Sequence, residues 1–222
     1  MYRAKLILGP LFCMLFVAGF SQRVIEGQVT DAHTAPEKAV LAYNKGVVFF
    51  NNKQYPQAIA AYRQAIVIDS DYTDAIDNLG LSFYQISKVD SAEFYFARSL
   101  KKMPTGLTAL QNMGMIKENN KEYDKALDYY NTIIKLSPQS PEGYYNASRI
   151  LSNTGKYEDA LQRAITAEKL YVTTSNPYIS DCHYQLLIIY FYMSNKPKAK
   201  EYLAICKKEG VQVDAQIENG LK

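Results

Sequence analysis

The chain has 222 residues, 48% of them hydrophobic, and a formal net charge of +3, which suits one globular domain or a short array of repeats. This charge is too weakly positive for a nucleic-acid-binding protein, which needs a strong basic patch. The only two histidines, His33 and His183, do not form a pair at metal-ligand spacing with a cysteine or acid beside them, so the sequence predicts no metal and no cofactor.

Residues 1–21 have the three parts of a secretory signal: the cations Arg3 and Lys5, an apolar stretch of about 15 residues, and the small residues Gly19 and Ser21. The stretch is shorter than the ~20 residues that span a bilayer. We expect cleavage after Ser21 or Gly19, and membrane contact only through this segment if it stays uncleaved. Export then places the protein in the periplasm or outside the cell, with residues 22–35 as a flexible leader.

The sequence repeats itself every 34 residues from position 39 onward. One column of the repeat holds an amide: Asn44, Asn78, Asn112 and Asn146. A second holds a small residue: Gly46, Gly80, Gly114 and Ser148. A third holds alanine: Ala58, Ala92, Ala126 and Ala160. The blocks are therefore 39–72, 73–106, 107–140 and 141–174. A fifth, degenerate block at 180–213 follows an insertion at Ser175–Ile179.

The second block shows the spacing most clearly, with Ile76, Leu79, Gly80, Phe83, Ala92, Phe96 and Pro104. This pattern resembles the tetratricopeptide repeat (TPR) family, in an exported, bacterial-type form. The resemblance implies an all-α fold, a right-handed superhelix of antiparallel helix hairpins with about five repeats over residues 36–208. Residues 209–222 would form a short cap or tail in which Ile217 and Leu221 cover the final repeat.

The residues themselves support helix pairs. Each block has two stretches of apolar residues at helical period, separated by breakers such as Asn51-Asn52 and Asn119-Asn120. The small column is expected where paired helices approach most closely, because large side chains there would separate the axes.

In this family the first helix of each repeat lines a concave groove. Carried over to this sequence, the groove positions include an amide ladder of Asn44, Asn78, Asn112, Asn146 and Gln185, which could pair with the backbone of an extended peptide. The alternative is that these amides descend from one duplicated unit and merely face solvent or cap local backbone.

Other groove positions carry charges and rings. The acids are Asp74, Asp77, Glu118, Glu142 and Asp181, and the only base is Arg149. The basic clamp with which some relatives hold a partner's C-terminal carboxylate is absent, so a neutral or basic segment is the expected partner. Tyr84 and Tyr145 lie in the polar middle of the groove and are candidate contact residues.

The sequence thus predicts a non-catalytic, protein-binding scaffold in the cell envelope. A glycan-binding subunit that stacks sugars on Tyr84 and Tyr145 is the alternative. No enzyme is expected, because no nucleophile and base stand together and no phosphate-binding loop occurs. Cys182 and Cys206 could form a disulfide after export, or could be small buried apolar residues.

Overall fold

The computed structural model describes residues 35–222, and all regular secondary structure in this part of the chain is α-helical. The helices are α2 (Glu37–Asn51), α3 (Tyr55–Ile68), α4 (Thr73–Gln85), α5 (Val89–Lys102), α6 (Leu107–Asn119), α7 (Tyr123–Leu136), α8 (Pro141–Asn153), α9 (Tyr157–Thr173), α10 (Ile179–Tyr192), α11 (Lys196–Lys208) and α12 (Ala215–Gly220). The predicted all-α fold is confirmed. The predicted signal segment and nearly all of the leader lie outside the described residues.

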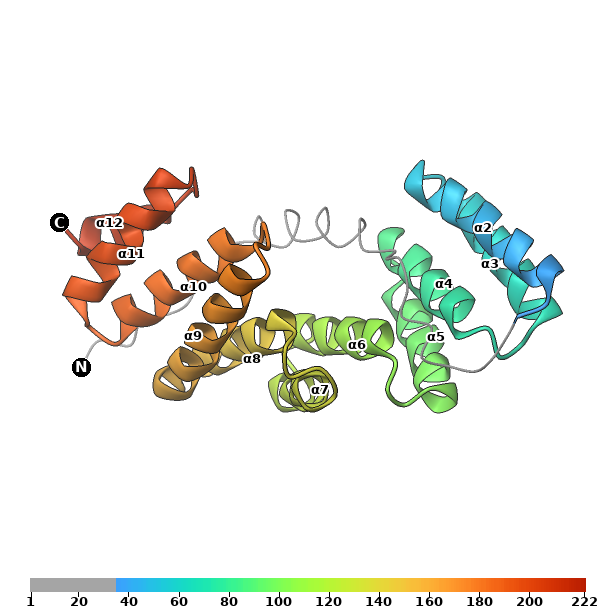
Figure 1. Ribbon diagram of the computed structural model, residues 1–222, viewed down its shortest axis with the longest axis horizontal. Helices are drawn as coiled ribbons and strands as arrows, with labels where there is room; N and C mark the ends of the chain where they lie inside the picture. The colour runs from blue at the N-terminus through green and yellow to red at the C-terminus, as the bar shows by residue number, and fades with distance from the viewer. Residues whose placement is uncertain (1–34) are drawn as a thin grey trace. The chain divides into compact units, whose positions relative to one another are not determined.

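Two compact units make up the chain, one ending at Ser82 and the other running from Phe83 to Lys222. The first holds α2, α3 and most of α4, and the second holds the end of α4 and helices α5 to α12 (Figure 1). In the part of the chain that the structure describes, no helix is both long and apolar enough to cross a membrane.

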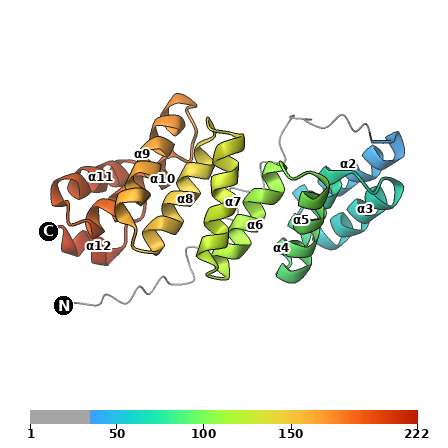
Figure 2. The same cartoon turned by 90° about the horizontal axis from the view of Figure 1, so that it is seen from below.

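Consecutive helices pair as hairpins. In the first unit α2 packs along α3, and in the second unit α6 packs along α7, α8 along α9, and α10 along α11. Neighbouring hairpins of the second unit touch through α5 and α6, α7 and α8, and α9 and α10, so its helices follow one another in chain order (Figure 2). In the second unit the first helices α6, α8 and α10 therefore each pack on the second helix of the block before, and then on the second helix of their own block.

In the first and third blocks the small column lies where the two helices of the hairpin approach closely. A β-carbon added to Gly46 would lie 2.5 Å from the Tyr62 ring, and one added to Gly114 would lie 2.6 Å from the Tyr130 ring. In both hairpins the tyrosine is buried and stands 16 residues after the glycine. Glycine at this position therefore lets an aromatic ring fill the space between the two helices.

The turn inside every hairpin has the same backbone geometry. The fifteenth residue of each repeat has a positive φ: Lys53 (58°), Ser87 (60°), Lys121 (61°), Gly155 (78°) and Ser194 (58°). The next residue donates its N–H to the carbonyl five residues earlier, as Glu122 does to Lys117 at 2.8 Å. These bonds are of the Schellman type, which ends a helix by satisfying its last carbonyls.

The end of the array departs from the regular period. The second helix α9 has 17 residues, whereas α3, α5 and α7 have 14 each, and it ends at Thr173, just before the insertion Ser175–Ile179. At the C-terminus α12 buries Ile217, and Leu221 directly after it is also buried. A β-carbon on Gly220 would lie 2.7 Å from the ring of Phe191, which shows how closely α12 lies against α10.

Candidate binding surface

Three first helices of the second unit carry an amide at the same repeat position: Asn112 on α6, Asn146 on α8 and Gln185 on α10. All three side chains are buried, and α8 and α10 are in direct contact. We call the surface of these helices that holds the amides the inner face, with the members Asn112, Glu118, Tyr145, Asn146, Arg149, Asp181 and Gln185.

The inner-face amides are only partly hydrogen-bonded. Asn112 donates its Nδ2 to the carbonyl of Thr108 at 2.7 Å, and Asn146 accepts at Oδ1 from Arg149 at 3.3 Å. Within residues 35–222, the buried Oδ1 of Asn112 and the buried Nε2 of Gln185 have no hydrogen-bond partner. A buried polar atom left in this way costs about 1–3 kcal/mol.

Arg149 is the hub of the inner face. Its guanidinium forms an ion pair with Glu118 on α6 and lies over the ring of Tyr145, 5.8 Å from the centroid. The Tyr130 hydroxyl, from α7, donates to the other carboxylate oxygen of Glu118 at 3.3 Å. The predicted groove base is therefore held by an acid of the neighbouring repeat, and the pair ties α6 to α8.

Asp181 is the second carboxylate of this region. It is half-buried on α10, and burial raises the pKa of its carboxyl, an effect that the charge of Arg149 opposes. Because Arg149 is already paired with Glu118, a further cation beside Asp181 would stabilise its partly desolvated carboxylate.

In the first unit, the predicted site residues lie on α2 and α4. Asn44 is exposed on α2, whereas Asn78 is buried and donates to the Tyr43 hydroxyl at 3.0 Å and to the Asp74 carbonyl at 2.9 Å. Asp77 is buried and Asp74 is exposed. Of these four residues only Asn44 and Asp74 are accessible, and the Asn78 amide joins α4 to α2 through Tyr43.

The two tyrosines singled out from the sequence differ in accessibility. Tyr145 is only 5% exposed and packs edge-on against Tyr171, so its ring offers almost no face for stacking. Tyr84 is half-buried, and its hydroxyl accepts from Asn119 at 3.0 Å. A sugar-binding role would therefore have to rest on Tyr84 without Tyr145.

Sequence profiles identify the repeats. Profiles described as tetratricopeptide repeat match residues 107–140 and 129–162, and one described as TPR repeat matches residues 46–87. The first of these ranges coincides with the third block, which the structure shows as the hairpin of α6 and α7. The chain is a tetratricopeptide repeat protein. No curated protein matches the sequence significantly.

Solved TPR structures share this fold at low sequence identity. MamA from Desulfovibrio magneticus RS-1 superposes with a TM-score of 0.69 at 16% identity, over 79% of this chain and 96% of that one. PilF from Pseudomonas aeruginosa gives 0.71 at 17%, over 82% and 80%. YrrB, described as a TPR protein with an unusual peptide-binding site, gives 0.62 at 20%, over 81% and 89%. At these identities the likeness shows the fold alone.

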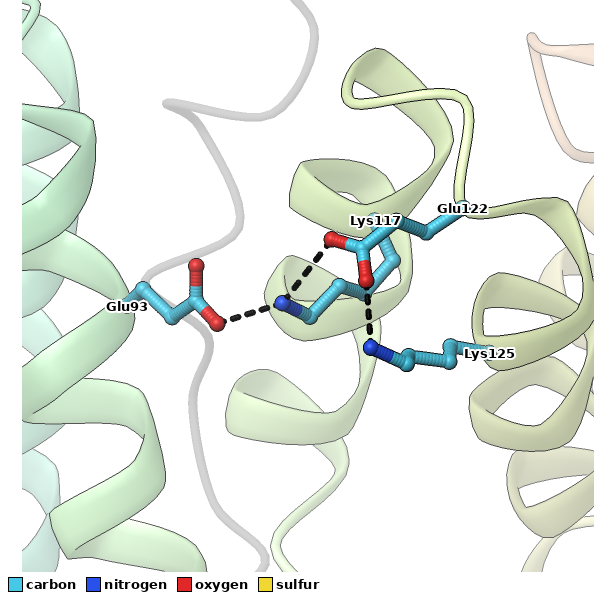
Figure 3. A network of polar contacts seen from close by, with 4 residues as sticks. All are labelled: Glu93, Lys117, Glu122 and Lys125. Carbon is cyan, nitrogen blue, oxygen red and sulfur yellow. Dashed lines mark hydrogen bonds and ion pairs between the residues drawn. The ribbon is translucent and has the colours of Figure 1, made fainter.

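One polar network of this TPR protein was not foreseen from the sequence. Lys117 on α6 forms ion pairs with Glu93 on α5 at 2.5 Å and with Glu122, before α7, at 3.2 Å, and Lys125 binds the other oxygen of Glu122 at 2.5 Å (Figure 3). Both carboxylates raise the pKa of Lys117, chiefly through the hydrogen bond to Glu93. These contacts join two repeats, and the sequence period alone does not show which charges of neighbouring repeats meet.

The two cysteines of the last TPR hairpin are buried, Cys182 on α10 and Cys206 on α11, and both are free thiols in the described part of the chain. The Cys182 thiol lies 3.4 Å from the carbonyl oxygen of Ala164 on α9 and donates to it. In this structure both cysteines are small buried residues, and a disulfide between them stays a prediction.

Proposed function

We propose that this TPR protein is a non-catalytic scaffold whose inner face binds an extended polypeptide segment. The observation that carries the proposal is the column of buried amides on α6, α8 and α10, in which Asn112 and Gln185 keep an acceptor and a donor without partners. An extended backbone offers N–H and C=O groups along its length, and so can supply both missing partners.

Binding of this kind recognises the backbone of the peptide more than its side chains. Small rotations of Asn112 and Gln185 would bring the two unpaired atoms to the surface, where a peptide N–H can donate to the Asn112 oxygen and a peptide carbonyl can accept from the Gln185 nitrogen. Each new bond would remove an existing desolvation cost, and this favours the bound state. The description of YrrB as having a peptide-binding site supports a peptide as the ligand class.

Charge favours a neutral or basic segment. With Glu118 neutralised by Arg149, the groove positions of the second unit keep Glu142 and Asp181 as acids, and those of the first unit keep Asp74 and Asp77. A lysine or arginine of the partner beside Asp181 would meet the half-buried carboxylate, whereas an acidic segment would be repelled. The secretory pattern of residues 1–21 supports a place in the cell envelope or outside the cell.

A displayed library of random 12-residue peptides tests the proposal. We expect the wild-type protein to enrich peptides with Lys or Arg, and the variant Asn112→Ala/Gln185→Ala to bind these peptides at least tenfold more weakly. Ser99→Ala is the matched control, since its buried hydroxyl also lacks a partner among the described residues but lies on the second helix α5. Equal binding by wild type and the double variant, or no enrichment by wild type, would contradict the proposal.

A further inference from the structure

Three positions of the first helix are buried in each of the last four repeats. They are the third, seventh and tenth: Ala75, Leu79 and Ser82; Ala109, Met113 and Ile116; Gly143, Ala147 and Ile150; and Cys182, Leu186 and Ile189. None of these side chains is more than 5% exposed wherever an exposure is given. The same three positions thus form the contact face of every one of these helices.

The preceding second helix covers this face in the second unit. On α8, a β-carbon at Gly143 would lie 2.9 Å from Ile134 and 3.1 Å from Ile133, both on α7. The buried residues Tyr130 and Ile133 of α7 belong to one cluster with Ala147 and Ile150 of α8. The helix pairs α5 with α6 and α9 with α10 make the equivalent contacts.

In the first repeat no helix among residues 35–222 covers the same face. Leu41 is 61% exposed and Val48 is 59% exposed, and the seventh position between them is Lys45, which is also exposed. Two large apolar side chains therefore lie exposed on one side of α2. In the later repeats the equivalent positions pack against a neighbouring helix. Leu41 is also larger than the Ala, Gly or Cys at its equivalents, so it projects as a knob.

We propose that this face of α2, formed by Leu41, Lys45 and Val48, is a docking surface for an amphipathic helix of another protein. That helix takes the place which a preceding repeat would fill. It carries a small residue opposite Leu41, apolar residues beside Val48, and an Asp or Glu that pairs with Lys45. Glu37 and Lys38 are both exposed one turn before Leu41 and offset one another, so Lys45, in the middle of the face, sets the preference for an acidic partner helix.

Charge argues against a second copy of this chain as the occupant. Two α2 faces would bring Lys45 of each copy together. At the C-terminal end α12 covers the last hairpin. On α11 Lys198 and Lys207 are paired with Glu201 and Glu218, and the exposed Lys196, Lys200 and Lys208 would repel Lys45 of a second copy. This surface belongs to α2 of the first unit and the inner face to helices of the second unit. Each proposal can therefore be tested without the other.

A photo-cross-linking amino acid at position 48 tests the proposal in cells that naturally make the full chain. The matched control carries the same amino acid at Val67, which is 85% exposed on α3 and lies outside the face. We expect position 48, but not position 67, to form one major cross-link, and the sequenced cross-linked peptide to be an amphipathic helix of another protein with an acidic residue. A synthetic copy of that peptide should bind the purified protein, and Lys45→Glu should weaken it at least fivefold.

A charge exchange makes the test specific. Replacing the acidic residue of the synthetic peptide with Lys should restore its binding to the Lys45→Glu variant. A cross-link to residues 22–34, a cross-link to a second copy, or no cross-link above the Val67 control would each overturn the proposal. An unchanged circular-dichroism melt of Lys45→Glu confirms that the exposed substitution leaves the fold intact.

Discussion

The ring of Tyr130 lies so close to the backbone of Gly114 that a β-carbon there would stand 2.6 Å from the nearest ring atom. We therefore expect Gly114→Ala to destabilise the protein. Overpacking costs about 1–3 kcal/mol, and the better helix propensity of Ala offsets up to about 1 kcal/mol of it. Urea unfolding should show a net loss of about 1–2 kcal/mol.

The same substitution should change sign once the ring is absent. In a Tyr130→Ala background, Gly114→Ala meets no aromatic ring and should be neutral or slightly stabilising. If the two substitutions instead add independently, the ring does not make glycine necessary at this position.

The recurrent left-handed turn predicts a stabilising substitution. Lys121 has a φ of 61°, which costs a side-chain-bearing residue about 1–2 kcal/mol, whereas glycine adopts it freely at an entropic cost of about 0.5–1 kcal/mol. Lys121→Gly should therefore raise the free energy of unfolding by about 0.5–1 kcal/mol, and Gly155→Lys should lower it by a similar amount. Lys169→Gly, inside helix α9, is the control and should destabilise.

Breaking the pair between Glu118 and Arg149 should be costly, because it leaves a guanidinium largely buried without its acid. For Glu118→Ala we expect a loss of about 3 kcal/mol, the lower end for buried pairs, since the Arg149 side chain is 25% exposed. Replacing both partners, as in Glu118→Leu/Arg149→Met, should recover most of the loss. A double variant no more stable than Glu118→Ala would show that the loss does not come from leaving the Arg149 guanidinium unpaired.

Ile217 anchors the short helix α12. Ile217→Asp places a charge in a buried site and should release α12 without unfolding the remaining helices, because local elements open separately from the core. Hydrogen exchange should become fast in residues 214–222, while α8 and α9 stay protected. Unchanged protection of α12 would mean that Ile217 does not hold it in place.

Much of the fold could be predicted because the same residue types recur every 34 residues. The Gly46 and Gly114 column indicated the close approach within hairpins, and the pairs Asn51-Asn52 and Asn119-Asn120 indicated where α2 and α6 end. The shared turn geometry was missed because Lys53, Ser87, Lys121, Gly155 and Ser194 have no chemical feature in common. There the fold imposes the conformation on unlike residues.

The site could be predicted only in part. The sequence placed Asn112, Asn146 and Gln185 in one column, but repeat spacing does not tell whether a side chain is open or covered, and all three are buried. Arg149 was expected as the only base of the groove, but the sequence did not show that it pairs with Glu118, 31 residues earlier. Pairings of this kind depend on rotamers and on the offset between neighbouring repeats, neither of which the 34-residue period defines.

Backbone methylation of a bound peptide tests the central claim most directly. For a peptide enriched by the wild-type protein, isothermal titration calorimetry would compare the unmodified form with forms in which single backbone N–H groups are methylated and with forms in which single side chains are cut to Ala. We predict that methylation of at least one N–H weakens binding at least tenfold, that most alanine substitutions have smaller effects, and that Asn112→Ala removes the methylation effect. Equal affinities for the methylated and unmodified peptides would contradict recognition of the backbone by the inner-face amides.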